Sequence, residues 1–193
     1  MGILGRLLRW SLYAAVAVAV LVSVAAAAHL YWADGPTGPL AGGAFETGTP
    51  TPLPPDYTRA LQGDFEFELV STGRSRTAGG LLLDDELYLT CDLGFIWSRV
   101  PDDTARGMLN VIYWFKTWHH DAMSDGRIRI RKDDRVYQAV LSRVEDPTKI
   151  AALKVALENE ASAFFQPDGL GPAPESGPSD VWFFHIAAPV EES

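Results

Sequence analysis

The apolar positions begin with one long uninterrupted run near the N-terminus. Residues 11–28 carry no charge, and the aromatic pair Tyr31-Trp32 follows them. At about 1.5 Å per residue, a helix of this length crosses a hydrocarbon core of about 30 Å. Arg6 and Arg9 precede the run and no lysine or arginine follows before Arg59, so the positive-inside rule keeps the N-terminus in the cytoplasm. The pattern predicts a single transmembrane helix with the remaining chain outside the cytoplasm.

A cleaved signal peptide is the alternative interpretation of this segment. The small residues at 25–28 are typical of a signal peptidase site, and cleavage near Ala28 would give a secreted protein. The run is longer than the usual signal-peptide core, and Tyr31-Trp32 lies where an interfacial aromatic belt would anchor a retained helix. We therefore expect a cytoplasmic stub and membrane anchor in residues 1–32.

After the anchor the chain loses its apolar period. Residues 33–57 are rich in Gly, Pro and Thr, a composition typical of linkers that do not order themselves. The remaining residues, 58–193, suffice for one compact domain. Within it, residues 166–179 form a second Gly/Pro-rich stretch, which predicts a long loop.

Polar and apolar residues alternate in several short stretches of the domain. Phe65, Phe67 and Leu69 share one face of a predicted strand, since side chains in a strand alternate between its two faces. Short acidic turns at 84–86 and 132–135 predict two hairpins. The predicted strands cover 65–69, 77–83, 87–91, 127–131, 136–144 and 181–186.

Two stretches have helical spacing instead. Residues 101–104 offer capping oxygens ahead of a stripe that includes Met108, Val111, Ile112, Phe115 and Trp118. Asp146-Pro147 opens a second helix, with a stripe of Ile150, Leu153, Leu157, Ala161 and Phe164. The order is three strands, helix, two strands, helix, strand, which predicts an antiparallel α+β barrel or curled sheet.

Net charge and cysteine content reduce the number of possible functions. The residues after the anchor carry 14 basic and 25 acidic side chains, and this net charge of about −11 argues against nucleic acid as a partner. Cys91 is the only cysteine, so no disulfide forms within the chain. Because Cys91 lies in an apolar strand pattern, we interpret it as a buried hydrophobe.

Several short motifs occur in an order known from one superfamily. They are Ser-Thr-Gly-Arg-Ser-Arg at 71–76, Glu-Leu-Tyr-Leu at 86–89, Trp-His-His-Asp at 118–121 and Arg-Val-Glu-Asp at 143–146. Residues 64–188 thereby resemble the FMN-binding split β-barrel superfamily, in particular its nitroreductase-like branch, which includes deazaflavin-dependent enzymes. The resemblance implies a six-stranded antiparallel split β-barrel with two flanking helices, here preceded by a transmembrane helix. It also implies FMN or a deazaflavin as cofactor and, as is common in such families, a homodimer.

The candidate cofactor site starts in the loop at 72–76. Thr72, Gly73, Arg74, Ser75 and Arg76 combine backbone N–H groups, hydroxyls and guanidinium groups, the donors that a phosphate requires. A solvated hairpin turn is the alternative interpretation.

Two further residues complete the candidate site. Arg129 lies by period two between Arg127 and Arg131, so it either extends the basic surface or belongs to an ordinary exposed face. Trp118 either stacks on the cofactor ring or packs its helix against the sheet.

No catalytic residue is identified by the sequence. His119, His120 and Asp121 lack the i, i+4 spacing of helical metal sites, and no metal site is predicted. Two functions remain: a membrane-anchored oxidoreductase that uses FMN or a deazaflavin, and a cofactor-free extracytoplasmic binding or interaction module on the same fold.

Overall fold

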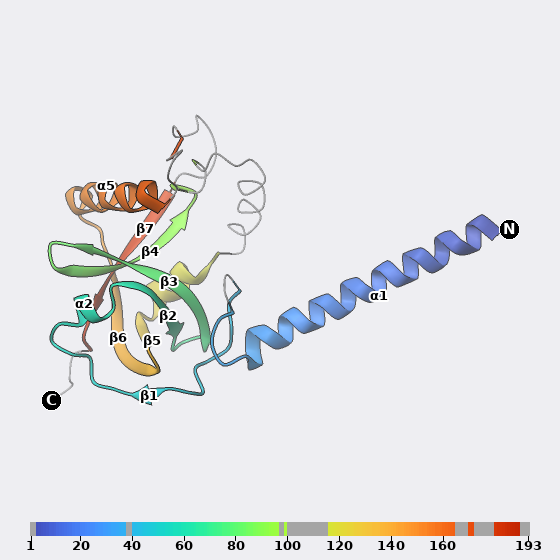
Figure 1. The fold of residues 1–193 in the computed structure, drawn as a ribbon, viewed down its shortest axis with the longest axis horizontal. Helices are drawn as coiled ribbons and strands as arrows, with labels where there is room; N and C mark the ends of the chain where they lie inside the picture. Colours follow the sequence, from blue (N-terminus) through green and yellow to red (C-terminus); the bar gives the residue numbers. More distant parts are fainter. Residues whose placement is uncertain are drawn as a thin grey trace.

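The computed structural model describes residues 3–37, 40–96, 99, 116–164, 170–171 and 180–189, and within them a long helix projects from an α+β domain (Figure 1). The long helix is α1, Ile3–Trp32. Its segment Arg9–His29 has a mean hydropathy of 2.2, and none of it is buried against the rest of the chain. Such a helix fits either a membrane anchor or a signal sequence.

In the described part of the chain, six strands close an antiparallel barrel. Their order around it is β5-β2-β3-β4-β7-β6, and β6 returns to β5. The strands are β2 Gly63–Leu69, β3 Arg74–Leu83, β4 Glu86–Leu93, β5 Arg127–Lys132, β6 Arg135–Arg143 and β7 Asp180–Ala187. The predicted α+β class with a six-stranded antiparallel barrel is therefore confirmed.

Acidic two-residue turns set the register of two hairpins. Asp84 and Asp85, between β3 and β4, have φ values of 52° and 62°, and Asp133 and Asp134, between β5 and β6, have 49° and 62°. Positive φ at both central residues is the conformation whose twist matches paired strands, and aspartate tolerates it better than most residues. Both predicted hairpins are confirmed.

The barrel interior holds the side chains that the alternation of β2 predicted. Phe65, Phe67 and Leu69 are at most 3% exposed. Helix α4, Trp118–Ser124, adds Trp118, whose ring centroid lies 5.0 Å from that of Phe67 and 5.5 Å from that of Phe184. The predicted helix between 101 and 115 lies outside the described residues.

Helix α5, Pro147–Phe164, covers part of the outer surface of the barrel. The Asp146 side chain accepts the Thr148 N–H at 2.8 Å, which caps the helix as its sequence predicted. Leu153 is fully buried against residues of β3, β4 and β7, among them Leu81, Tyr88 and Phe183.

The segment that follows α1 is ordered against the barrel. We call the described residues 33–37 and 40–47 the strap; Gly42 and Ser75 of β3 exchange both backbone hydrogen bonds, at 3.0 and 3.1 Å. Beyond the strap, β1 (Thr49–Pro50) pairs in parallel with β6, and α2 (Tyr57–Ala60) precedes β2. The expectation that this Gly/Pro-rich stretch takes no ordered structure is wrong for its described residues, because hydrogen bonds to the barrel supply the order that its own composition does not.

Candidate functional site

The predicted phosphate loop at 72–76 is a loop only in its first two residues, which end the turn from β2 to β3, because Arg74, Ser75 and Arg76 already belong to β3. The N–H groups of Thr72 and Gly73 both donate to the Leu69 carbonyl, at 3.2 and 2.9 Å. Gly73 has a φ of 60°, a left-handed conformation that glycine adopts without steric cost. These two backbone donors therefore hold the turn itself.

The next two residues, at the start of β3, bind the end of α1 and the strap. Arg74 donates from Nη2 to the Tyr31 hydroxyl at 2.7 Å, and its guanidinium lies 5.1 Å from the centre of the Tyr31 ring. Ser75 is fully buried, and its Oγ donates to the Gly43 carbonyl at 2.6 Å. These side chains thus connect the barrel to Tyr31 of α1 and to Gly43 of the strap.

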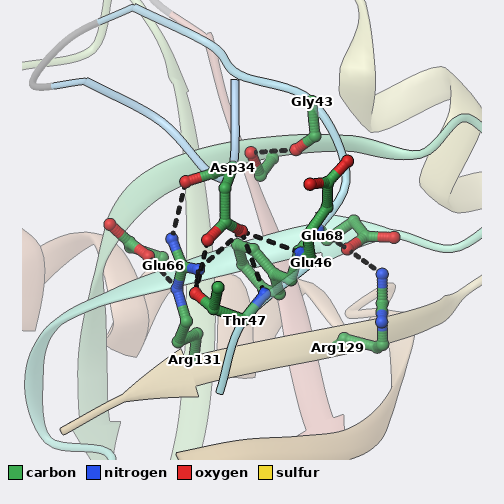
Figure 2. Close-up of polar contacts among 10 residues, drawn as sticks. Asp34, Gly43, Glu46, Thr47, Glu66, Glu68, Arg129 and Arg131 are labelled. Carbon is green, nitrogen blue, oxygen red and sulfur yellow. Dashed lines mark hydrogen bonds and ion pairs between the residues drawn. The ribbon is translucent and has the colours of Figure 1, made fainter. Parts of the chain in front are cut away.

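Arg129, on the outer face of β5, binds a glutamate that the strap covers. Its Nη2 lies 2.5 Å from Glu68 Oε2, and the same carboxylate oxygen accepts the Phe45 N–H at 2.7 Å (Figure 2). Glu68 is only 3% exposed because the strap covers it. A buried carboxylate of this kind is stable only with such partners.

Arg131 makes the densest set of contacts to the strap. Its Nε donates to Glu66 at 2.6 Å, its Nη1 donates to the Asp34 carboxylate at 2.8 Å, and its Nη2 donates to the Asp34 carbonyl at 3.1 Å (Figure 2). The guanidinium also lies 4.4 Å from the centre of the Phe45 ring, within cation–π range. One side chain thereby binds both ends of the strap and a neighbouring strand.

Asp34 is the acceptor at the centre of this network. Besides Arg131, it accepts the Thr47 hydroxyl and the Glu46 N–H, the latter at 2.8 Å. The Thr47 hydrogen bond, followed by the backbone and Arg131 contacts, lowers the pKa of Asp34 to about 2 despite an opposing effect of burial. The carboxylate is therefore ionised across the ordinary pH range.

The register of the strands places these charges opposite one another. Glu66 pairs with Arg131 and Glu68 with Arg129 in the antiparallel β2–β5 ladder. Directly opposed unlike charges stabilise a sheet, each pair contributing roughly 0.2–1 kcal/mol. The glutamates of β2 and the arginines of β5 thus form one surface of paired opposite charges, which the strap partly covers.

Two glycines allow the strap to pack closely against itself and against the end of α1. A Cβ on Gly43 would lie 2.7 Å from the Ala33 carbonyl oxygen and 2.8 Å from that of Tyr31. A Cβ on Gly42 would lie 1.7 Å from the Gly35 carbonyl oxygen. Any larger residue at either position would force the backbone apart.

Arg76 is separated from Ser75 because successive strand residues face opposite sides. It pairs with Phe67, whose side chain fills the barrel interior, and the Arg76 Nη1 is buried without a hydrogen-bond partner among the described residues. Burial lowers the pKa of Arg76, the nearby Arg74 adds to this effect, and the Asp121 carboxylate opposes it. Among the predicted site residues, Arg76 is thus the one with a buried donor, Nη1, that has no partner in the described structure.

Trp118, the last predicted site residue, belongs to the core and is 2% exposed. Its neighbour His119 is also buried, packs 4.6 Å from the Trp182 ring centre, and has an Nδ1 atom without a partner in the described structure. Burial lowers the pKa of His119 to about 4. In the described residues, no group of three or more His, Cys, Asp or Glu side chains is placed to hold a metal ion.

An open hollow of about 500 Å³ lies beside the Asp34 end of the strap. Its lining is mostly charged and includes Asp34, Asp64, Glu66, Arg131, Asp133 and Asp134. The seven predicted cofactor residues do not line it. The structure thus brings Arg74, Ser75 and Arg129 to the strap and the end of α1, keeps Thr72 and Gly73 in the turn, and places Arg76 and Trp118 inside the barrel.

The comparisons with known proteins assign no family. No family model matches the sequence, and no curated protein matches it. Sequence reasoning missed Asp34, Phe45 and Glu68 as partners of the arginine face. The sequence held a signal for Glu68 only, in the period-two spacing of Glu66 and Glu68, which mirrors that of Arg129 and Arg131.

Proposed function

We propose that the chain is a single-pass membrane protein whose barrel works as an extracytoplasmic binding module without a resident flavin. The observation that carries this proposal is the position of residues 31–47, which bind three of the predicted cofactor residues. Arg74, Ser75 and Arg129 all contact this segment or the glutamate that it covers.

The free-energy cost of replacing the contacts of Ser75 and Arg129 by a cofactor phosphate favours this proposal. A cofactor phosphate at Ser75 and Arg129 would displace the Gly43 carbonyl and the Glu68 carboxylate. Glu68 would then remain buried without its cationic partner, which costs on the order of 1–3 kcal/mol or more for a charged group. The intramolecular contacts therefore compete directly with a phosphate.

A flavin- or deazaflavin-dependent oxidoreductase is the second candidate. Two observations favour it: the resemblance of residues 64–188 to the split-barrel superfamily, and the unpartnered Nη1 of Arg76. A buried guanidinium with an unused donor is a fitting partner for an anionic group. The two candidates make opposite predictions for flavin binding.

The test is a titration of the full chain in detergent with FMN and with a deazaflavin. We expect no binding up to high micromolar concentration and no visible absorption band in the purified protein. Binding by the wild type that Arg74→Ala weakens about ten- to a hundredfold, as the loss of a charge-assisted hydrogen bond would, favours the oxidoreductase instead. Arg135→Ala, at an exposed arginine of β6, is the matched control and should leave any binding unchanged.

The membrane placement has its own test. A reporter fused after Ser193 should be active only outside the cytoplasm, since Arg6 and Arg9 fix the orientation. The protein should stay in the membrane fraction after carbonate washing. A mature form that starts near His29 would show that the segment is a cleaved signal peptide.

A further inference from the structure

A few large apolar side chains of the domain are exposed. Outside α1, the large hydrophobic side chains that the described residues leave well exposed are Leu40 at 62%, Val70 at 43%, Met123 at 46% and Val155 at 58%. Single exposed hydrophobics are ordinary on a soluble surface. Leu40, Val70 and Met123 differ from Val155 in their position relative to α1.

Leu40 lies in the strap, whose described residues stay close to the end of α1. Thr37 and Leu40 exchange both backbone hydrogen bonds at 3.1 Å, and the Gly43 N–H returns to the Ala33 carbonyl at 2.9 Å. Leu40 is therefore held close to the end of the apolar helix.

Val70 and Met123 belong to the end of the barrel that contacts α1. Val70 precedes the turn whose Arg74 binds Tyr31, and its own N–H donates to the Arg127 carbonyl at 3.1 Å. Met123 lies in the last turn of α4, just before Arg127 begins β5. In Figure 1, the turn between β2 and β3 lies next to the end of α1, whereas α5, the helix of Val155, lies on the opposite side of the barrel.

We propose that the face formed by Leu40, Val70 and Met123 docks on the lipid bilayer that holds α1, with these side chains at the boundary between headgroups and acyl chains. This inference rests on the proposed membrane anchoring. Tyr31 and Trp32, 62% and 80% exposed, mark the interfacial level where aromatic rings concentrate. The contacts from Arg74, Ser75 and Arg131 to residues 31–43 hold the face next to that level, and apolar groups there gain free energy by leaving water.

The experiment labels one cysteine at a time in the full chain with a thiol-reactive fluorophore. The variants are Leu40→Cys, Val70→Cys and Met123→Cys, with Val155→Cys as the matched exposed control and Ala19→Cys as the reference within α1. The native Cys91 does not interfere, because it is buried and burial raises the pKa of its thiol to about 12. The labelled proteins are reconstituted into phosphatidylcholine vesicles that contain lipids with a nitroxide quencher near the headgroup, for positions 40, 70, 123 and 155, or deep in the acyl chain, for position 19.

We expect quenching at positions 40, 70 and 123 to exceed that at 155 at least threefold. If position 19 is quenched but these three behave like 155, the docking face is refuted while the membrane anchor stands. If position 19 is not quenched either, the anchor itself is refuted, and the docking face with it. A shift of dye emission at 40, 70 and 123 without lipid quenching would assign the face to a second copy of the chain and also overturn the proposal.

Discussion

Arg131 connects three parts of the chain that lie far apart in the sequence. Its guanidinium binds Asp34 of the strap and Glu66 of β2 and lies over the Phe45 ring. Its side chain is 14% exposed, so water screens these contacts less than it would on the open surface. Individual surface ion pairs contribute little, but a shared and half-buried cation holds several groups at once.

The first prediction concerns the pH dependence of the strap. The pKa of Asp34 is about 2 in the folded protein and lies near its ordinary value of 3.8 in the unfolded chain. A carboxylate with a lowered pKa stabilises the fold above about pH 4 and loses that contribution as the pH falls toward 2. Asp34→Asn should therefore lower the melting temperature at pH 6 to 7, and this difference should vanish near pH 2.

The control for this prediction is Asp56→Asn, at an exposed aspartate whose side chain makes no capping hydrogen bond. Thermal melts of the full chain in detergent between pH 2 and 7 measure both variants. An Asp34→Asn deficit that stays constant with pH would contradict the role of the charge.

Part of the residue-scale network was predictable. The period-two arginines at 127–131 were recognised as one face, and Glu66 and Glu68 alternate in the same way on a predicted neighbouring strand. The sequence alone does not set the register between β2 and β5, so the opposition of these charges could not be derived. The burial of Glu68 depends on Phe45 and the strap, 23 residues away from it.

At the scale of elements, the strap is held by backbone proximity as well as by charge. Gly43 lies so close to the carbonyls of Tyr31 and Ala33 that no Cβ fits. The second prediction is that Gly43→Ala destabilises the folded chain by about 1–3 kcal/mol, the usual cost of forcing atoms into a packed contact. Chemical denaturation of the full chain in detergent measures the change.

Gly79→Ala is the control for the strap. Gly79 lies exposed in β3, and its Cβ would meet only Asp64 Oδ1 at 3.7 Å, an ordinary contact. This substitution should change stability by at most about 0.5–1 kcal/mol, in the stabilising direction for a strand glycine. Equal effects of the two substitutions would show that the strap does not need its close approach.

The third prediction tests the packing of α5. Leu153→Ala should cost about 2–5 kcal/mol of unfolding free energy, because the fully buried side chain leaves a cavity between α5 and the barrel. Val155→Ala on the exposed side of the same helix should stay within about 0.5 kcal/mol. A Leu153→Ala variant as stable as the wild type would contradict the observed packing.

Elements with a strong period were predictable, and the strap was not. The alternation of Phe65, Phe67 and Leu69 and the cap at Asp146 correctly predicted β2 and α5. The strap has no apolar period, and its order comes from long-range hydrogen bonds and ion pairs to β2, β3 and β5. Composition therefore indicated a flexible linker where tertiary contacts override it.

In the whole molecule, the strap fixes the position of the barrel relative to α1. A free Gly/Pro-rich linker of the length of residues 33–57 would separate the domain from α1 by a variable distance of roughly 25–30 Å. The observed contacts from Arg74, Ser75 and Arg131 to residues 31–43 instead join the barrel and α1 into one body (Figure 1). Under the proposed membrane anchoring, a module held in this way presents one fixed face to the bilayer.

The most direct test of this account is the distance distribution between spin labels on α1 and on the barrel. Ala27→Cys and Val155→Cys provide exposed label positions on α1 and α5, in the full chain reconstituted into lipid nanodiscs. Double electron–electron resonance should give a single narrow distribution, which Gly43→Ala broadens by loosening the strap. A broad distribution in the wild type, with the spread expected of a free linker and no change in Gly43→Ala, would contradict the account.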